Sequence, residues 1–228
     1  MAWQLSTRVQ LGGFILSLFG WVLSCVTTVV PFWKTLQLEL NELETRSMGL
    51  WHVCVTQDES LMECKGQASL LALPLEFKVS RVVMVTANGL GLLAFLLSIL
   101  ALKCLKTGDQ NPRRKRHFGI AGGTLFCVSG MANLVPISWV AYTTVQEFLD
   151  ETMPEIVSRW EFGEALFLGW FAAFFLILGG FLLICACFLE AKEPPKQLAV
   201  YCKPRMQTSV TLPRRHPYSP PKNADLVI

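Results

Sequence analysis

Four long apolar stretches, separated by polar segments, dominate the hydrophobic pattern of the chain. They cover residues 9–30, 82–102, 118–146 and 165–189 and contain no Asp, Glu, Lys, Arg or His. A helix needs about 20 predominantly apolar residues to cross a bilayer. The first stretch is longer than the apolar core of a signal peptide, and no small-residue cleavage site follows it. The pattern therefore predicts four transmembrane helices, which we place at residues 9–30, 82–102, 118–141 and 164–189.

Between the first two stretches the pattern changes to a period of two. Residues Lys34–Leu40 alternate polar and apolar side chains, and Trp51, Val53 and Val55 repeat this alternation. Such alternation is typical of half-buried β-strands. Residues Gln67–Leu73 are instead rich in Ala and Leu without alternation and end at Pro74. They predict a short helix along the membrane surface.

Charge sets the expected orientation of the four spans. Residues 103–117 hold six bases and one acid, and residues 190–228 hold seven bases and three acids. Residues 31–81 hold five bases and seven acids, and residues 142–164 hold one base and six acids. Because Lys and Arg collect in cytoplasmic segments, both termini are expected to be cytoplasmic. The non-membrane segments are then a cytoplasmic N-terminus (1–8), an extracellular loop (31–81), a cytoplasmic loop (103–117), a second extracellular loop (142–163) and a disordered cytoplasmic tail (190–228).

Composition agrees with a membrane protein that has no nucleic-acid partner. Hydrophobic residues make up 52% of the 228 residues and charged residues 16%, against about 25% charged in soluble domains. The net charge of +3 hides a surplus of bases on the cytoplasmic side and of acids outside. We interpret the bases as topology signals with some attraction to anionic membrane lipid.

Cys54 and Cys64 are the only two of eight cysteines in an expected extracellular loop. Disulfides form and persist in that environment, so we predict that these two pair. The closed loop would stabilise the fold by roughly 2–3 kcal/mol in the chain-entropy model. Two free thiols or a metal pair is the alternative, but zinc needs four ligands and only His52 is near.

The sequence contains no catalytic, cofactor or metal constellation. The three histidines, His52, His117 and His216, are scattered, and no glycine-rich phosphate loop is present. The spans lack the charged residues that mark transport or proton relay. We therefore predict that the chain is not an enzyme. The polar residues Asn88, Asn133 and Ser138 are expected to form interhelical hydrogen bonds.

The extracellular pattern matches a known family. Trp33, Gly49-Leu50-Trp51, Cys54 and Cys64 form a W…GLW…C…C motif with the spacing W-x17-W-x2-C-x9-C. Further matches are Leu71-Ala72-Leu73-Pro74 with Arg81 and Met84, Leu134–Trp139, and Glu161, Gly163, Ala165, Leu166, Gly169 and Trp170. The chain resembles the claudin family of tight-junction proteins. Peripheral myelin protein relatives and glutamate-receptor auxiliary subunits share the first motif, and the motifs of the third and fourth spans narrow the resemblance to claudins.

The resemblance implies both a fold and a function. The fold is a left-handed bundle of four transmembrane helices with an extracellular antiparallel sheet, four strands coming from the first loop and one from the second. Claudins polymerise within one membrane, pair with claudins of the adjacent cell, and seal or selectively perforate the paracellular space at tight junctions of the plasma membrane. Calcium-independent cell adhesion and partnership with itself and other claudins are implied as well. The alternative is a tetraspan regulator or auxiliary subunit that does not polymerise.

Site residues carry over by position. Leu70 would insert into a neighbour's pocket lined by Phe148, Leu149 and Phe162, or else pack onto its own bundle. Many claudins have an F-Y-N-P-like turn where this chain has Phe148-Leu149-Asp150-Glu151.

Lys65, directly after Cys64, is the candidate for charge selectivity and would repel cations. The surrounding acids would attract them: Glu39, Glu42, Glu44, Asp58, Glu59 and Glu63.

The cytoplasmic segments contain two further candidates. The last residues, Leu226-Val227-Ile228, are typical of a ligand for PDZ scaffold proteins, where a terminal peptide adds a strand to the domain. Claudin tails commonly end in Tyr-Val instead. Cys104, Cys185 and Cys187 are candidates for palmitoylation at the cytoplasmic ends of spans, or are buried small apolar residues.

Overall fold

The computed structural model describes residues 2–37, 44–57, 61–67, 74–102, 112–149 and 160–191. Its four helices are α1 (Ala2–Val29), α2 (Leu75–Ala101), α3 (Pro112–Leu149) and α4 (Glu164–Ala191). By length and composition each is able to cross a membrane. The four spans predicted from the apolar stretches are therefore confirmed.

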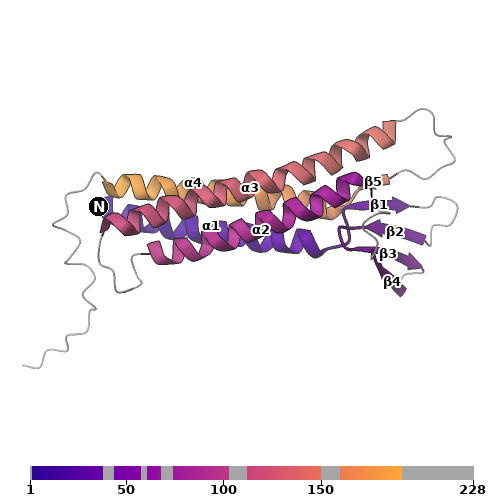
Figure 1. Cartoon of the computed structure of the whole chain (residues 1–228), viewed down its shortest axis with the longest axis horizontal. Coiled ribbons are helices and arrows are strands. Elements are labelled where there is room, and N and C mark those ends of the chain that lie inside the picture. The colour runs from indigo at the N-terminus through magenta and orange to yellow at the C-terminus, as the bar shows by residue number, and fades with distance from the viewer. Residues whose placement is uncertain are drawn as a thin grey trace, which may run out of the picture. The chain divides into compact units, whose positions relative to one another are not determined.

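The helices pack side by side in a bundle (Figure 1). Within the unit Met1–Glu193, α4 packs extensively against α1 and α3, α3 packs against α2, and the contact between α1 and α2 is the least extensive. Glycines allow the closest crossings. A Cβ atom on Gly180 would lie 2.6 Å from the carbonyl oxygen of Gly123, and one on Gly179 would lie 2.8 Å from that of Gly13. Small residues on α4 thus bring its neighbours into backbone contact.

A polar cluster joins three of the helices inside the bundle. The Ser24 Oγ of α1 lies 2.6 Å from Asn88 Oδ1 of α2 and 2.9 Å from Asn133 Oδ1 of α3. The amide of Asn88 donates to Thr28 Oγ1 at 2.8 Å. The interhelical hydrogen bonds predicted for Asn88 and Asn133 are therefore confirmed. Ser138 is exposed, whereas the preceding residue, Ile137, is buried in the bundle. The interhelical role predicted for Ser138 is therefore wrong.

The five short strands form one antiparallel sheet beside one end of the helices (Figure 1). They are β1 (Lys34–Gln37), β2 (Glu44–Met48), β3 (His52–Gln57), β4 (Leu61–Gly66) and β5 (Trp160–Phe162), in the order β4-β3-β2-β1-β5. Four strands come from the segment between α1 and α2, and one comes from the segment between α3 and α4. This confirms the sheet that the resemblance implied.

Helix α3 is longer than a membrane crossing requires. Its 38 residues correspond to about 57 Å, whereas the hydrocarbon core is about 30 Å thick. The helix passes through Pro136 and continues eight residues beyond the predicted span of 118–141. Its final turns therefore run alongside the sheet, where α3 contacts β5.

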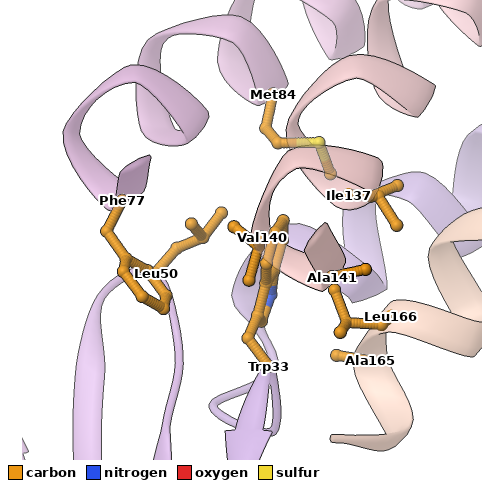
Figure 2. Packing of buried hydrophobic residues seen from close by; sticks show 9 residues of the cluster. All are labelled: Trp33, Leu50, Phe77, Met84, Ile137, Val140, Ala141, Ala165 and Leu166. Carbon is orange, nitrogen blue, oxygen red and sulfur yellow. The ribbon is translucent and has the colours of Figure 1, made fainter. Parts of the chain in front are cut away.

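A buried cluster joins the sheet to the bundle (Figure 2). Its members come from the ends of β-strands and from three helices: Trp33, Leu50, Phe77, Met84, Ile137, Val140, Ala141, Ala165 and Leu166. Trp33 is fully buried there, and its indole N–H donates to the carbonyl oxygen of Thr27 at 2.9 Å. This motif tryptophan is therefore part of the buried core.

Gly163 closes the junction between β5 and α4. Its N–H donates to the carbonyl oxygen of Trp33 at 3.0 Å, and the N–H of Ala165 donates to that of Phe32 at 2.9 Å. A Cβ atom on Gly163 would overlap the Phe32 carbonyl group. Only glycine allows this backbone approach.

Several predicted features lie outside the described residues. They are the surface helix with Leu70, Cys104, and the tail with Leu226, Val227 and Ile228.

We expect Gly163→Ala to lower the free energy of unfolding by about 1–3 kcal/mol, because overpacked backbone contacts must separate. The melting temperature of the detergent-purified chain should fall by about 2–12 °C. Gly89→Ala is the matched control, since no atom lies within 4 Å of the added Cβ position. Equal melting temperatures for the two variants would contradict the close approach at Gly163.

Candidate functional site

A hollow of about 430 Å³ opens where the end of α3, strand β5 and the start of α4 meet. It is lined by Thr144, Val145, Phe148, Leu149, Trp160, Glu161, Phe162 and Phe167. The walls are mostly aromatic and aliphatic, and Glu161 contributes the only carboxylate among these lining residues. A hollow of this kind suits an apolar side chain better than a charged or metal ligand.

The structure brings three predicted residues together in this hollow. Phe148, Leu149 and Phe162, named from the resemblance, all line it. Their exposed fractions are 44%, 66% and 40%, which is high for aromatic and aliphatic side chains outside the membrane-crossing part of the helices. These residues therefore form an open, unfilled apolar surface rather than part of the core.

The sequence did not identify the other wall residues. Thr144, Val145, Phe148 and Leu149 follow one another at helical spacing, so they share one face of α3. This spacing could have indicated that the helix continues with one apolar face, but the predicted span ended at residue 141, before these residues. Trp160 and Phe167 join them only through the fold.

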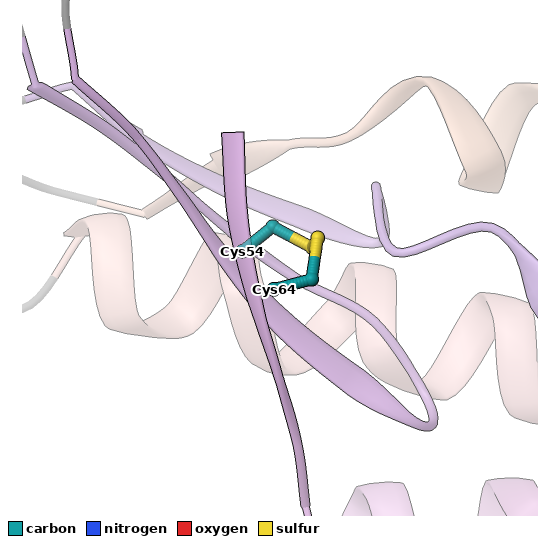
Figure 3. The surroundings of a disulfide bond; sticks show 2 residues. All are labelled: Cys54 and Cys64. Atoms are coloured by element: carbon teal, nitrogen blue, oxygen red, sulfur yellow. A yellow bond between two sulfur atoms is a disulfide. The ribbon is translucent and has the colours of Figure 1, made fainter. Parts of the chain in front are cut away.

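A disulfide bond joins β3 to the edge strand β4, at the end of the sheet opposite β5 (Figure 3). Cys54 of β3 lies directly opposite Cys64 of β4 in the antiparallel register, and their sulfur atoms are bonded. This confirms the predicted pair, so these sulfur atoms are not available as metal ligands. Among the described residues, no group of three or more His, Cys, Asp or Glu could hold a metal ion.

The remaining motif residues hold the sheet on the bundle. The buried Arg81 of α2 donates through Nε to the carbonyl oxygen of Leu50 and through Nη2 to Gln67 Oε1 at 3.0 Å. Its guanidinium carbon also lies 5.1 Å from the ring centre of the exposed Trp51. Gly49 allows close approach, since a Cβ atom there would overlap Pro31. The motif therefore has a structural role in positioning the sheet.

Lys65 is exposed on β4. Side chains two residues apart on a strand share a face, so Lys65 and the exposed Glu63 lie on the same face. The register places Arg46 of β2 and Val55 of β3 in the same row as Glu63. The described charges on this face therefore include two bases and one acid besides the buried Lys34. Glu39, Glu42, Asp58 and Glu59, and the side chain of Glu44, lie outside the description.

The two described palmitoylation candidates differ in access. Cys187 is buried, and its sulfur occupies the space beside Gly119 of α3. Cys185 is partly exposed. A thioester-linked acyl chain needs an accessible thiol, so Cys185 is the better candidate of the two.

A family model and individual relatives identify the same protein family over most of the chain. A model of the PMP-22/EMP/MP20/Claudin family matches residues 7–183. The chain is 37% identical to Claudin-1 of Mus musculus over 218 residues, which are 94% of this chain and 95% of that protein. It is 40% identical to Claudin-19 of Homo sapiens over 185 residues, 80% of this chain and 82% of that protein. It is 36% identical to Claudin-7 of Homo sapiens over 185 residues, 80% of this chain and 87% of that protein.

Replacing both bridged cysteines tests how much the disulfide bond stabilises the fold. We expect Cys54→Ser/Cys64→Ser to lose about 2–3 kcal/mol of stability, because the unfolded chain regains loop entropy. The measurement is thermal unfolding of the purified chain with and without reductant. Reductant should destabilise the wild type and a Cys185→Ser control equally and leave the double variant unchanged. A reductant effect that persists in the double variant would contradict this assignment.

Proposed function

The chain belongs to the PMP-22/EMP/MP20/Claudin family and is a claudin-like, multi-pass membrane protein of tight junctions. On this premise we propose that it polymerises side by side within one membrane and pairs with claudins of the adjacent cell. The polymer would then seal, or charge-selectively control, the space between cells. The observation that carries the proposal is the apolar hollow between α3 and β5, which the described residues of one chain leave open.

In this proposal the sheet faces the cell exterior and both termini face the cytoplasm. The support is the distribution of Lys and Arg along the sequence. The disulfide at the sheet end is consistent with this orientation, since disulfides persist outside the cell.

Side-by-side assembly proceeds by insertion of Leu70 of one copy into the hollow of the next. Phe148 and Leu149 form one wall and Phe162 the other, and all three expose apolar surface that the insertion would cover. Burial of one such side chain is worth about 1.5–3 kcal/mol. This is modest for one contact, but it repeats along a strand of many copies.

Pairing between cells, calcium-independent adhesion and binding of PDZ scaffold proteins rest on the family and on the sequence alone. The second loop reads Phe148-Leu149-Asp150-Glu151 where many claudins have an F-Y-N-P-like turn, so the family geometry of pairing between cells is not carried over to this loop. The terminal Leu226-Val227-Ile228 is proposed as the PDZ ligand. Inner-leaflet lipid is proposed to bind the basic cytoplasmic segments.

For selectivity we propose a barrier or anion preference with Lys65 in the path. Lys65 and Arg46 lie on one face of the sheet. Glu63 precedes Lys65 by two residues on β4 and lies in the same cross-strand row as Arg46, and it is the one acid on this face whose side chain the structure describes. Charges more than about 8 Å apart are largely screened at physiological salt, so the nearest charges decide the sign of the local potential. In this proposal the exposed ammonium group of Lys65 repels cations along the path.

Freeze-fracture of junction-free cells expressing the chain tests polymerisation. We expect continuous strands for the wild type and fragmented strands for Phe148→Ala at equal surface delivery, because one wall of the hollow is lost. Phe181→Ala is the matched control, since Phe181 is exposed on α4 away from the hollow. Dispersed wild-type particles would favour a non-polymerising regulator or auxiliary subunit, and intact strands in Phe148→Ala would exclude the hollow from assembly.

Dilution potentials across epithelial monolayers test selectivity. A unit charge about 8 Å from an ion contributes about 0.5 kcal/mol in water and, after screening at physiological salt, about 0.2 kcal/mol. The two-unit change of Lys65→Asp therefore stabilises a cation and destabilises an anion by about 0.4 kcal/mol each, and should raise the cation-to-anion permeability ratio about fourfold. Met62→Asp, which adds a carboxylate to the opposite face of β4, should change the ratio less. If Lys65→Asp matches the wild type, Lys65 does not line the path.

A further inference from the structure

Lys34 of β1 is a buried cation that joins three elements. Its side chain is 3% exposed, and Nζ lies 2.8 Å from Glu76 Oε1 in the first turn of α2. The same Nζ lies 3.1 Å from Glu147 Oε2 near the end of α3. It also lies 5.8 Å from the ring centre of Phe77. The sequence pattern placed Lys34 only on the polar face of a strand, because its partners are 42 and 113 residues away.

The same residue contacts both walls of the hollow. Through its backbone, Lys34 is directly opposite Phe162 in the pairing of β1 with β5, which forms one wall. Through its side chain it holds Glu147, which immediately precedes Phe148 and Leu149 of the other wall. Lys34 therefore links the strand of one wall to the helix of the other, in addition to the direct contact between α3 and β5.

The end of α3 needs such a tether. Residues Val145–Leu149 are all exposed, although Val145 and Phe148 are each more than half covered, so apolar burial holds the last turn only in part. Glu147 lies two residues before the helix end at Leu149, where the helix dipole disfavours a carboxylate. The Lys34 ammonium group offsets this effect. Without it, Glu76 and Glu147 would face each other less than about 6 Å apart, since both lie close to one nitrogen.

We propose that Lys34 is a positioning residue that sets the width of the hollow by tying the end of α3 to the sheet. The tether stands on the contacts within one chain, whereas its role in assembly rests on the proposed function of the hollow. The two parts can therefore be tested separately on the full-length chain.

Hydrogen exchange of the detergent-purified monomer tests the tether. Glu147→Gln should speed exchange of the Val145–Leu149 amides about three- to tenfold, because the ion pair with Lys34 is replaced by a weaker hydrogen bond to an uncharged amide. Glu147 is 48% exposed on its side chain, so this variant keeps the fold. Glu63→Gln removes an exposed carboxylate from β4 and serves as the control, for which no change in these amides is expected.

A double-mutant cycle separates the tether from a local helix effect. Lys34→Met/Glu76→Gln removes the cation without leaving a buried carboxylate unpaired. In this background Glu147→Gln should leave exchange unchanged or slow it slightly, because only the unfavourable dipole interaction remains. An equal acceleration in both backgrounds, or no acceleration by Glu147→Gln in the wild type, would overturn the proposal.

The strand assay then decides the role in assembly. If Glu147→Gln loosens the end of α3 and also fragments strands, the tether positions the hollow for assembly. If the end of α3 loosens but strands formed by both Glu147→Gln and Phe148→Ala stay continuous, the proposed use of the hollow fails while the tether stands. If only Glu147→Gln leaves strands continuous, the positioning role in assembly is overturned.

Discussion

The fold depends on one packing constraint, the burial of the first loop's apolar side chains in the open end of the helix bundle. Trp33, just before β1, and Leu50, between β2 and β3, are fully buried among side chains of α2, α3 and α4. Arg81 then satisfies the Leu50 carbonyl group from α2. Because these contacts fix the sheet to the helices, every surface that the sheet presents has a defined position relative to the membrane-spanning part.

The hollow is a direct consequence of this anchoring. With the sheet fixed, β5 extends it at the edge of β1, and the long α3 passes beside β5 instead of ending at the membrane boundary. The two walls therefore enclose an apolar hollow that the described residues leave open. The buried Lys34 adds an electrostatic link at this place, so apolar packing positions the sheet while an ion pair positions the helix end.

Much of this arrangement could be predicted from the sequence. The four spans follow from apolar runs, the disulfide follows from the compartment of Cys54 and Cys64, and the five-stranded sheet follows from the family motif. The apolar run 118–146 covers most of the extension of α3, but the span placed at 118–141 fell short, because membrane thickness alone does not reveal that the last turns of the helix contact the sheet. The ion pairs of Lys34 were also inaccessible, since they join residues far apart in the sequence through the tertiary fold.

The central claim, that one copy fills the hollow of the next, is tested most directly by cross-linking between copies. Two differently tagged chains, one with Leu70→Cys and one with Phe162→Cys, would be co-expressed and oxidised in intact cells. The account predicts a disulfide-linked pair carrying both tags, which is absent when either cysteine is omitted. A chain that carries both substitutions and forms only an internal bond, with no mixed pair, would show instead that Leu70 packs onto its own bundle.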